Sequence, residues 1–239
     1  ASLKYVCARN SNVTIVPDGT YYTYEHFKTM LGIDTDFYFE GLENSELHKM
    51  CKQECFAFSY INDVRDGFSK QDKYELTMKD AQTGGLNTFV VNSQNTLLRY
   101  TYDGTIDNLT IPTKIGPYKV AAVGERVFEN YCNLESLTIP RTVQAIGAGA
   151  FQGCHKLENV YFDGFNLEGG DNVDINLTAF QTQNYTGTQH ACGGSSVGTE
   201  SDNTPSVKLN FIGPISSSFG PFKLAMSSGG KYNASSQKE

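Results

Sequence analysis

The segment Leu137–Phe151 reads LTIPRTVQAIGAGAF, and its order of apolar residues, proline and glycine decides the fold. Leu137 and Ile139 flank one polar residue, which is the period-two pattern of a strand with one buried face. Pro140 has no backbone N–H to donate, so the strand is predicted to end there. A second inward face follows, and Phe151 is predicted to fill the interior.

The same order of residues occurs once earlier, in LTIPTKIGPYKVAAVGERVF (Leu109–Phe128). The step from Leu109 to Leu137 is longer than the later steps, because the first copy holds five extra residues before Val120. Seven later positions recur after 23 residues: Val120 and Val143, Val123 and Ile146, Gly124 and Gly147, Phe128 and Phe151, Leu134 and Leu157, Leu137 and Val160, Ile139 and Phe162. A fixed period of this length indicates the coils of a solenoid.

A single coil cannot bury its own apolar edge, so each coil needs a neighbour or a cap. Gly147 is predicted to permit a turn conformation that other residues resist. Small Ala150 is predicted to let the backbone come close beside Phe151. The predicted repeat core consists of Leu109, Ile111, Val123, Phe128, Leu134, Leu137, Ile139, Ile146, Phe151, Leu157, Val160 and Phe162.

The pattern IP-x-x-V-x-x-I-G-x-x-A-F-x-x-C-x-x-L-x-x-V resembles the BspA-type leucine-rich repeat over about Asp107–Asp163. The stretch IGPYKVAAVGERVF is similar to the opening coil of such arrays. Cys154 holds the family's cysteine position in the second coil, whereas Tyr131 holds it in the first, with Cys132 one residue later. The resemblance implies a secreted or surface-attached, non-enzymatic protein that serves adhesion or protein binding.

The sequence predicts a β-rich α+β fold, with a small α+β domain over residues 1–105 and a short solenoid with an irregular C-terminal cap over residues 106–239. Ser45–Glu54 is predicted to form a helix capped by its first serine. Lys73–Val91 is predicted to form a hairpin that turns near Gly84 and Gly85. Further strands are predicted at Cys55–Ile61 and Thr96–Gly104.

Beyond Asp163 the repeat decays, and Asn176–Phe180 and Val207–Phe222 are predicted to form two distorted coils. The polar segment between them is predicted to be a surface excursion or a binding loop. The polar tail Ser227–Glu239 is predicted to lie on a second copy, since open strand edges invite pairing. That contact would give a homo-oligomer or a filament.

Composition limits the classes of partner. The 239 residues carry a net charge of −7 and a pI near 5.1 without a basic stripe, which argues against nucleic acid. No apolar stretch approaches the ~18 residues of a membrane span. A chain that begins with Ala1 is expected to be processed or trimmed. Together with the resemblance, these features predict an extracellular or cell-surface protein.

Six cysteines, an even number, predict at least two disulfides in an extracellular chain. Cys7 is a better partner for Cys51 or Cys55 than these two are for each other, because a bond within one helix would be strained. Cys132 and Cys154 alternatively remain buried thiols of the solenoid. The candidate disulfide cysteines are Cys7, Cys51, Cys55, Cys132, Cys154 and Cys192.

Five Asn-x-Ser/Thr sequons mark candidate N-glycosylation sites at Asn12, Asn108, Asn176, Asn184 and Asn233. Several would carry glycans in a eukaryotic secretory source, and most would be bare in a bacterial source. Asn108 is predicted to point outward, opposite to the buried Leu109, so a glycan there would not disturb the core.

No motif supports catalysis, a cofactor or a metal. GSSVG (Gly194–Gly198) matches a nucleophile elbow, but Ser196 lacks the strand and helix that this turn needs. The segment Asn62–Lys73 resembles a calcium loop, but Val64 and Lys73 stand where oxygen ligands are required, so a plain turn is favoured. The histidines lack zinc-site spacing.

Two weaker features remain. Asp171 and Asp174 lie beside glycines and give a weak hint of a cation site, and Tyr21, Tyr22 and Tyr24 form either a contact surface or a half-buried strand. The sequence therefore leaves two function classes open. The first is a module that binds a protein or glycan ligand, and the second is a structural subunit of an extracellular homopolymer.

Overall fold

The structure is a computed structural model that describes residues 3–13, 15, 26, 29, 36–62, 67, 69–163, 173–176, 179–180 and 210–212. The chain forms two compact units. The first comprises Ala1–Gly104 and Lys114–Val120, and the second comprises Thr105–Thr113 and Ala121–Glu239. This division differs from the expected one after residue 105 mainly in Lys114–Val120, which packs with the first unit.

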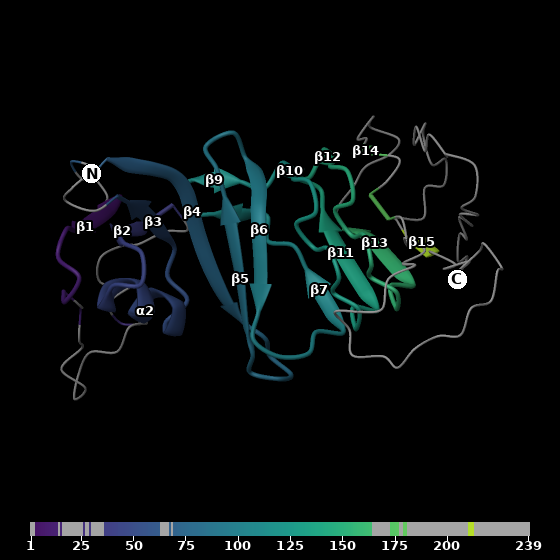
Figure 1. The fold of residues 1–239 in the computed structure, drawn as a ribbon, viewed down its shortest axis with the longest axis horizontal. Helices are drawn as coiled ribbons and strands as arrows, with labels where there is room; N and C mark the ends of the chain where they lie inside the picture. Colours follow the sequence, from purple (N-terminus) through teal and green to yellow (C-terminus); the bar gives the residue numbers. More distant parts are fainter. Residues whose placement is uncertain are drawn as a thin grey trace, which may run out of the picture. The chain divides into compact units, whose positions relative to one another are not determined.

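The sheet strands of the first unit follow the order β1-β2-β3-β4-β5-β6 (Figure 1). The first three pair in parallel, and the last three pair antiparallel with their neighbours. Their bounds are Tyr5–Ala8, Tyr38–Leu42, Phe58–Ile61, Lys70–Lys79, Leu86–Val91 and Thr96–Tyr102. The β-rich α+β class predicted from the sequence is confirmed.

Helix α2 (Glu46–Gln53) confirms the predicted helix and its cap. The Ser45 side chain accepts the His48 backbone N–H at 3.2 Å. His48 stands where a capping box has Glu, and its Nδ1 accepts the Asn44 backbone N–H at 3.0 Å. The histidine thus satisfies a backbone donor just outside the helix.

The core of the first unit lies between α2 and the parallel strands. It consists of Phe37, Phe39, Leu47, Met50, Cys51, Phe56, Phe58 and Tyr60. The strand predicted from Cys55 begins only at Phe58, because Cys55 has a φ of +58° and the Phe56 N–H still bonds the Cys51 carbonyl. All four residues of β3 are buried, so the alternation expected for a half-exposed strand is absent there.

Two of the hairpins in the first unit bear on the predictions. The predicted turn between β4 and β5 is confirmed, with Gly84 at a φ of +73° and its N–H bonded to the Asp80 carbonyl at 2.9 Å. Strands β8 (Lys114–Ile115) and β9 (Tyr118–Lys119) form the second hairpin. Tyr118 packs on Tyr74 with ring centroids 4.4 Å apart, which explains why this hairpin groups with the first unit.

The second unit is a parallel solenoid, and its larger sheet has the order β15-β13-β11-β7 (Figure 1). The strands are β7 (Asn108–Thr110), β11 (Ser136–Pro140), β13 (Asn159–Asp163) and β15 (Asn210–Ile212). Leu137 pairs with Val160 and with Leu109, so the predicted repeat and its longer first step are confirmed as strand registers. Strand β15 lies within Val207–Phe222, one of the two predicted distorted coils.

The second side of each coil is a short strand. Strands β10 (Ala122–Val123), β12 (Ala145–Ile146) and β14 (Asp174–Ile175) pair in parallel. Val123 lies opposite Ile146, and Ile146 lies opposite Ile175, so the second step along the chain is longer than the first. The coil that follows Ile146 therefore exceeds the regular repeat, and the prediction of a distorted coil at Asn176–Phe180 is confirmed.

The interior of the solenoid matches the predicted repeat core, since all twelve residues are at most 4% exposed. Phe128, Phe151 and Phe180 form a stack with centroid separations of 4.9 and 5.1 Å. Gly147 has a different role from the one expected. A Cβ there would lie 2.9 Å from the backbone of Gly124 and Glu125, so glycine is required by close packing of successive coils rather than by its φ.

Candidate functional site

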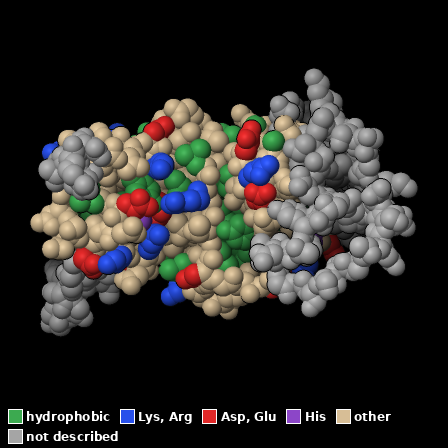
Figure 2. Space-filling view, in the orientation of Figure 1, with side chains coloured by type: hydrophobic (Ala, Val, Ile, Leu, Met, Phe, Trp, Pro, Cys, Tyr) green, Lys and Arg blue, Asp and Glu red, His purple; other side chains and the backbone are tan. Residues whose placement is uncertain are grey.

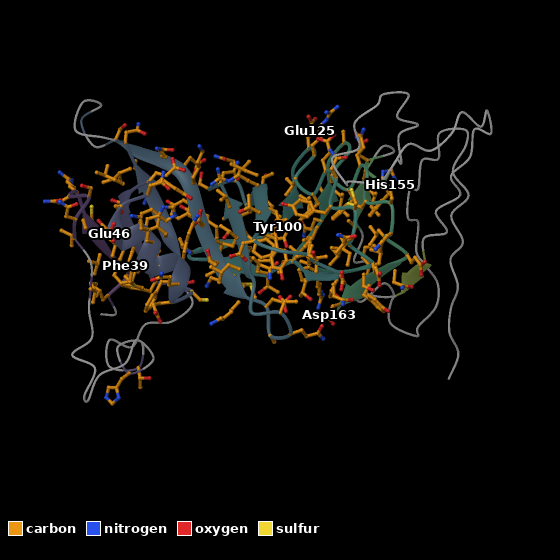
Figure 3. All side chains as sticks on the ribbon, turned by 60° about the horizontal axis from the view of Figure 1, so that its bottom comes forward. Phe39, Glu46, Tyr100, Glu125, His155 and Asp163 are labelled. Carbon is orange, nitrogen blue, oxygen red and sulfur yellow. The ribbon has the colours of Figure 1, made fainter. Side chains whose placement is uncertain are left out.

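The solvent face of the β7-β11-β13 sheet is the candidate functional site. Each strand alternates between buried apolar and exposed or half-buried polar residues. The strand register brings the outward residues into two rows, Asn108–Ser136–Asn159 and Thr110–Thr138–Tyr161. Asp163, labelled in Figure 3, follows at the end of β13 and is exposed. We call this set the solenoid face.

Tyr161 is the large exposed side chain of the solenoid face, at 38% exposure. Its direct neighbour in the row is Thr138, and Thr110 lies one strand further. On its other side Tyr161 pairs with Ile212 of β15. No sequence motif pointed to Tyr161, although its position one repeat after Thr138 marked it as outward-facing. The face thus joins one aromatic ring to adaptable hydrogen-bonding groups.

An acidic row borders the solenoid face. Asp107, Glu135 and Glu158 precede the three strands and are all exposed. The Asp107 carbonyl accepts the Glu135 N–H at 2.7 Å, and the Glu135 carbonyl accepts the Glu158 N–H at 3.0 Å, so the three occupy equivalent places in successive coils. In the view of Figure 2, basic and acidic side chains are interspersed elsewhere on the described surface. The solenoid face is therefore suited to a partner with basic groups.

The comparison with protein families decides what this solenoid is. Residues 86–185 match the model of the BspA type leucine rich repeat region, in six copies. The resemblance to the BspA-type leucine-rich repeat is thus confirmed for this segment. Repeats of this family are typical of surface proteins and of protein binding, and they are generally scaffolds rather than enzymes. No curated protein matches the sequence.

Three solved structures resemble parts of the chain. A leucine-rich cell surface protein from Faecalibacterium prausnitzii A2-165 is 33% identical over 44% of this chain and 27% of its own, with a TM-score of 0.33. A leucine-rich repeat protein from Bacteroides capillosus ATCC 29799 is 27% identical over 36% of this chain and 70% of its own, with a TM-score of 0.28. The T. pallidum leucine-rich repeat protein is 20% identical over 37% of this chain and 45% of its own, with a TM-score of 0.25. The match thus spans about a quarter of the Faecalibacterium chain.

The cysteines of the BspA-type repeat and of the first unit correct the disulfide prediction. Cys7, Cys51, Cys55 and Cys154 are free thiols, whereas Cys132 is disulfide-bonded. Four free thiols among six cysteines contradict the prediction of at least two disulfides. Cys192 lies outside the described residues.

Burial explains why two of these thiols stay unpaired. Cys51 is 1% exposed within the core under α2, and burial together with the Glu75 carboxylate raises its pKa. Cys154 donates to the Phe128 carbonyl at 3.1 Å, and burial raises its pKa to about 12. Both behave as small core residues, which was the alternative considered for Cys154.

Three of the predicted sequons lie in the described part of the chain. Asn12, Asn108 and Asn176 are all exposed, and Asn108 lies in the outer row of the solenoid face. A glycan on Asn108 would cover Ser136, its neighbour in the register. Asn184 and Asn233 lie outside the described residues, and glycosylation of the five stays a prediction.

The remaining sequence motifs give no site in the described part. The Asn62 side chain donates to Ser69 Oγ at 2.7 Å, and the Asp72 carboxylate accepts the Ser93 N–H at 2.8 Å. Residues 63–66 and 68 of the segment that resembles a calcium loop lie outside the described residues. Among the described residues, no three His, Cys, Asp or Glu side chains converge as metal ligands. Described helices are all too short or too polar to cross a membrane.

Several predicted features cannot be placed. The nucleophile-elbow serine Ser196, the aspartates of the weak cation hint, the tyrosines of residues 21–24 and the tail of residues 227–239 all lie outside the residues or side chains that the structure describes. His48 and His155 are described, the first buried and the second exposed, and neither takes part in a metal cluster of described residues.

The first unit contains a buried ionic network that the sequence did not reveal. Glu75 is 1% exposed, and its carboxylate accepts hydrogen bonds from His48 Nε2 at 2.8 Å and from the Tyr60 hydroxyl. Because His48 Nδ1 accepts from the backbone, Nε2 carries the donated proton. Lys52 and Arg99 add ammonium and guanidinium groups at 3.7 and 3.8 Å.

The electrostatics of Glu75 follow from these contacts. Burial by itself raises the pKa of the carboxyl, but hydrogen bonds from His48 and Tyr60 and the nearby positive charges outweigh it, so the pKa is lowered. Phe58 stacks on the His48 ring at 4.5 Å. The network therefore holds α2 on the sheet as a structural element. Cys51 of α2 is buried and its pKa is raised, so its thiol is no activated nucleophile.

Proposed function

We propose that this chain is a non-enzymatic extracellular or cell-surface protein that binds a protein ligand through the solenoid face. The observation that carries the proposal is the composition of that face. It has one exposed tyrosine in a row of threonines, a second row of Asn and Ser, and an acidic border. Such residues form adaptable paratope-like contacts, with Tyr as a rigid anchor.

The acidic row makes the expected ligand basic. Asp107, Glu135 and Glu158 repeat one carboxylate per coil along the edge of the face. Rows of like charge steer an oppositely charged partner and fix its register more than they add affinity. The match of residues 86–185 to the BspA-type repeat supports both the surface location and the adhesive role.

The test uses the full chain against an array of purified extracellular proteins, with every hit remeasured by surface plasmon resonance. Tyr161→Ala is expected to weaken binding about tenfold, as for a central aromatic anchor. Its control is Leu98→Ala, which removes a similarly exposed apolar side chain (42%) from β6 of the first unit and should leave affinity unchanged.

Thr138→Lys places a bulky cation in the middle of the face, and Thr101→Lys makes the same change at an exposed position of β6. Only the first is expected to abolish binding. A ligand that binds both Tyr161→Ala and Thr138→Lys like the unaltered protein would exclude the solenoid face as its contact surface.

A structural subunit of an extracellular homopolymer is the second candidate. Its support is β1, which among the described strands pairs only with β2, so that one edge of β1 has no described partner strand. Light scattering of the full chain at micromolar concentration tests it. A strictly monomeric chain would leave only the binding module.

A further inference from the structure

Lys70 lies in a cluster of tyrosines on the sheet of the first unit. Its ammonium is 4.9 Å from the ring centroid of Tyr38, 5.1 Å from that of Tyr74 and 5.9 Å from that of Tyr5. Distances below about 6 Å are those of cation–π contacts. We call these three rings the tyrosine cage. They contact each other, because Tyr38 stacks on Tyr5 at 5.5 Å and meets Tyr74 edge-on at 5.5 Å.

Two polar acceptors complete the surroundings of the ammonium. Lys70 Nζ lies 3.0 Å from Glu40 Oε2 and donates to the Tyr38 hydroxyl at 3.0 Å. The carboxylate of Glu40 is well shielded, with 13% of its side chain exposed, whereas the Lys70 side chain is 40% exposed. The Glu40 carboxylate thus lies deeper in the cluster than Lys70, and the Lys70 ammonium reaches it from the solvent side.

A buried hydroxyl without a described hydrogen-bond partner lies beside the cage. Ser59 is fully buried, and its Oγ has no hydrogen-bond partner among the described residues. The register places Ser59 between Glu40 on β2 and Tyr74 on β4, on the same face of the sheet. A buried hydroxyl without a partner is costly, which makes it a marker of a site rather than of simple packing.

A wall of the cage comes from the β8–β9 hairpin. The Tyr118 hydroxyl is 3.4 Å from that of Tyr74. Gly116 lies close to Tyr38, since a Cβ at this glycine would stand 3.8 Å from the tyrosine. The three rings of the cage therefore come from β1, β2 and β4, and β3 and the hairpin surround them, whereas the cation inside is a side chain from the start of β4.

We propose that the tyrosine cage with Glu40 is a binding site for a primary alkylammonium group, namely a lysine side chain of a protein ligand, and that Lys70 occupies the site in the free protein. The choice of lysine as source rests on the proposed function. Aromatic rings alone would favour a quaternary ammonium, but Glu40 and the Tyr38 hydroxyl accept N–H donors, which the primary ammonium of Lys70 supplies here and a quaternary ammonium lacks.

Lys70 acts as a tethered competitor. Its local concentration at the cage is of millimolar order because it is attached to the same strand, so a free amine binds the unaltered protein poorly. A protein ligand that also contacts other surfaces can displace it, since the released Lys70 regains side-chain freedom in water.

The test measures thermal unfolding of the full chain with n-butylammonium, at a concentration of about 10 mM. Lys70→Ala empties the cage, and added n-butylammonium is expected to raise its melting temperature by about 3 °C, against less than about 1 °C for the unaltered protein. Tetramethylammonium at the same concentration should act weakly, because it offers no N–H donor. In the double variant Lys70→Ala, Glu40→Gln the response should disappear.

Lys70→Met is the second variant, because it fills the cage with an apolar chain of similar length. It should fold and should not respond to n-butylammonium. An equal response of Lys70→Ala and the unaltered protein would overturn the proposal. Failure of both variants to fold would overturn it too, because Lys70 would then be a fixed structural element. Neither result bears on the solenoid face, whose test uses Tyr161 and Thr138.

Discussion

Phe128 and Phe151 lie face to face in consecutive coils, with ring centroids 4.9 Å apart and ring planes 3° apart. Phe180 continues the stack on the other side of Phe151. The middle ring therefore has an aromatic neighbour on both sides, and it is 2% exposed. Removal of this ring should affect both coil interfaces together.

Phe151→Ala is expected to lower the free energy of unfolding by about 3–5 kcal/mol, since it removes a buried aromatic ring and leaves a cavity. Chemical denaturation measured by circular dichroism gives this value. The control is Tyr161→Ala on the outside of the same coil, which should cost less than about 1 kcal/mol. Equal midpoints for Phe151→Ala and the unaltered protein would contradict the solenoid core.

Gly147→Ala is expected to destabilise the protein by about 1–3 kcal/mol, because its Cβ would meet the backbone of the preceding coil at 2.9 Å. The same denaturation experiment applies. Gln144→Ala, slightly earlier in the same coil and exposed, is the control and should be nearly neutral. A neutral Gly147→Ala would show that the coils are less closely packed than described.

Glu75→Gln should remove a stabilising contribution that depends on pH. The folded pKa of Glu75 is lowered, so its contribution is complete above the unfolded value of about 4.3 and is lost as pH falls through the folded pKa. The difference in unfolding free energy between Glu75→Gln and the unaltered protein is therefore expected to be largest near neutral pH and to shrink below about pH 4.

The groups that face this carboxylate are His48, Tyr60, Lys52 and Arg99. Both proteins keep these four groups, so the effect of their own titration on the unfolding free energy largely cancels in the difference. Glu46→Gln at the start of α2 is the control, with a change below about 1 kcal/mol for an exposed ion pair. A difference that stays constant from pH 7 to about pH 2 would argue against the lowered pKa.

Thiol labelling tests the cysteine states. Four cysteines should react in denaturant without reductant, namely Cys7, Cys51, Cys55 and Cys154. In the native protein the exposed Cys7 should react before Cys51 and Cys154, which are protected by burial. Two or fewer labelled cysteines in denaturant would restore the original expectation of at least two disulfides.

The solenoid was predictable because its signal is local and repeated. Val123, Phe128 and Leu137 each have a counterpart one repeat later with the same inward role, so two coils specify one another. The distorted coil at Phe180 was also within reach, since Asn176–Phe180 repeats the small-residue–Phe step. The reason for Gly147 was not, because only the distance to the preceding coil distinguishes close packing from a positive φ.

The features of the first unit were hidden by sequence distance. Glu75 lies in a strand whose first four residues are exposed or half-buried, and its partner His48 is 27 residues away. Lys70 and its cage come from strands that begin at residues 5, 38 and 70. The cysteines misled for another reason. Their even number suggests pairing, but burial of Cys51 in a helix–sheet core has no signature in a count.

The backbone bonds between coils also determine how the solenoid responds to force. The Phe128 N–H bonds the Ala150 carbonyl at 2.8 Å, and the Phe151 N–H bonds the Ala179 carbonyl at 2.7 Å, so these bonds run along the stacking direction. Tension along that direction loads one coil interface as a whole, and a coil detaches as a unit. Each detachment of a regular coil is expected to lengthen the chain by about 80 Å, so the solenoid should extend under force in discrete steps of this size.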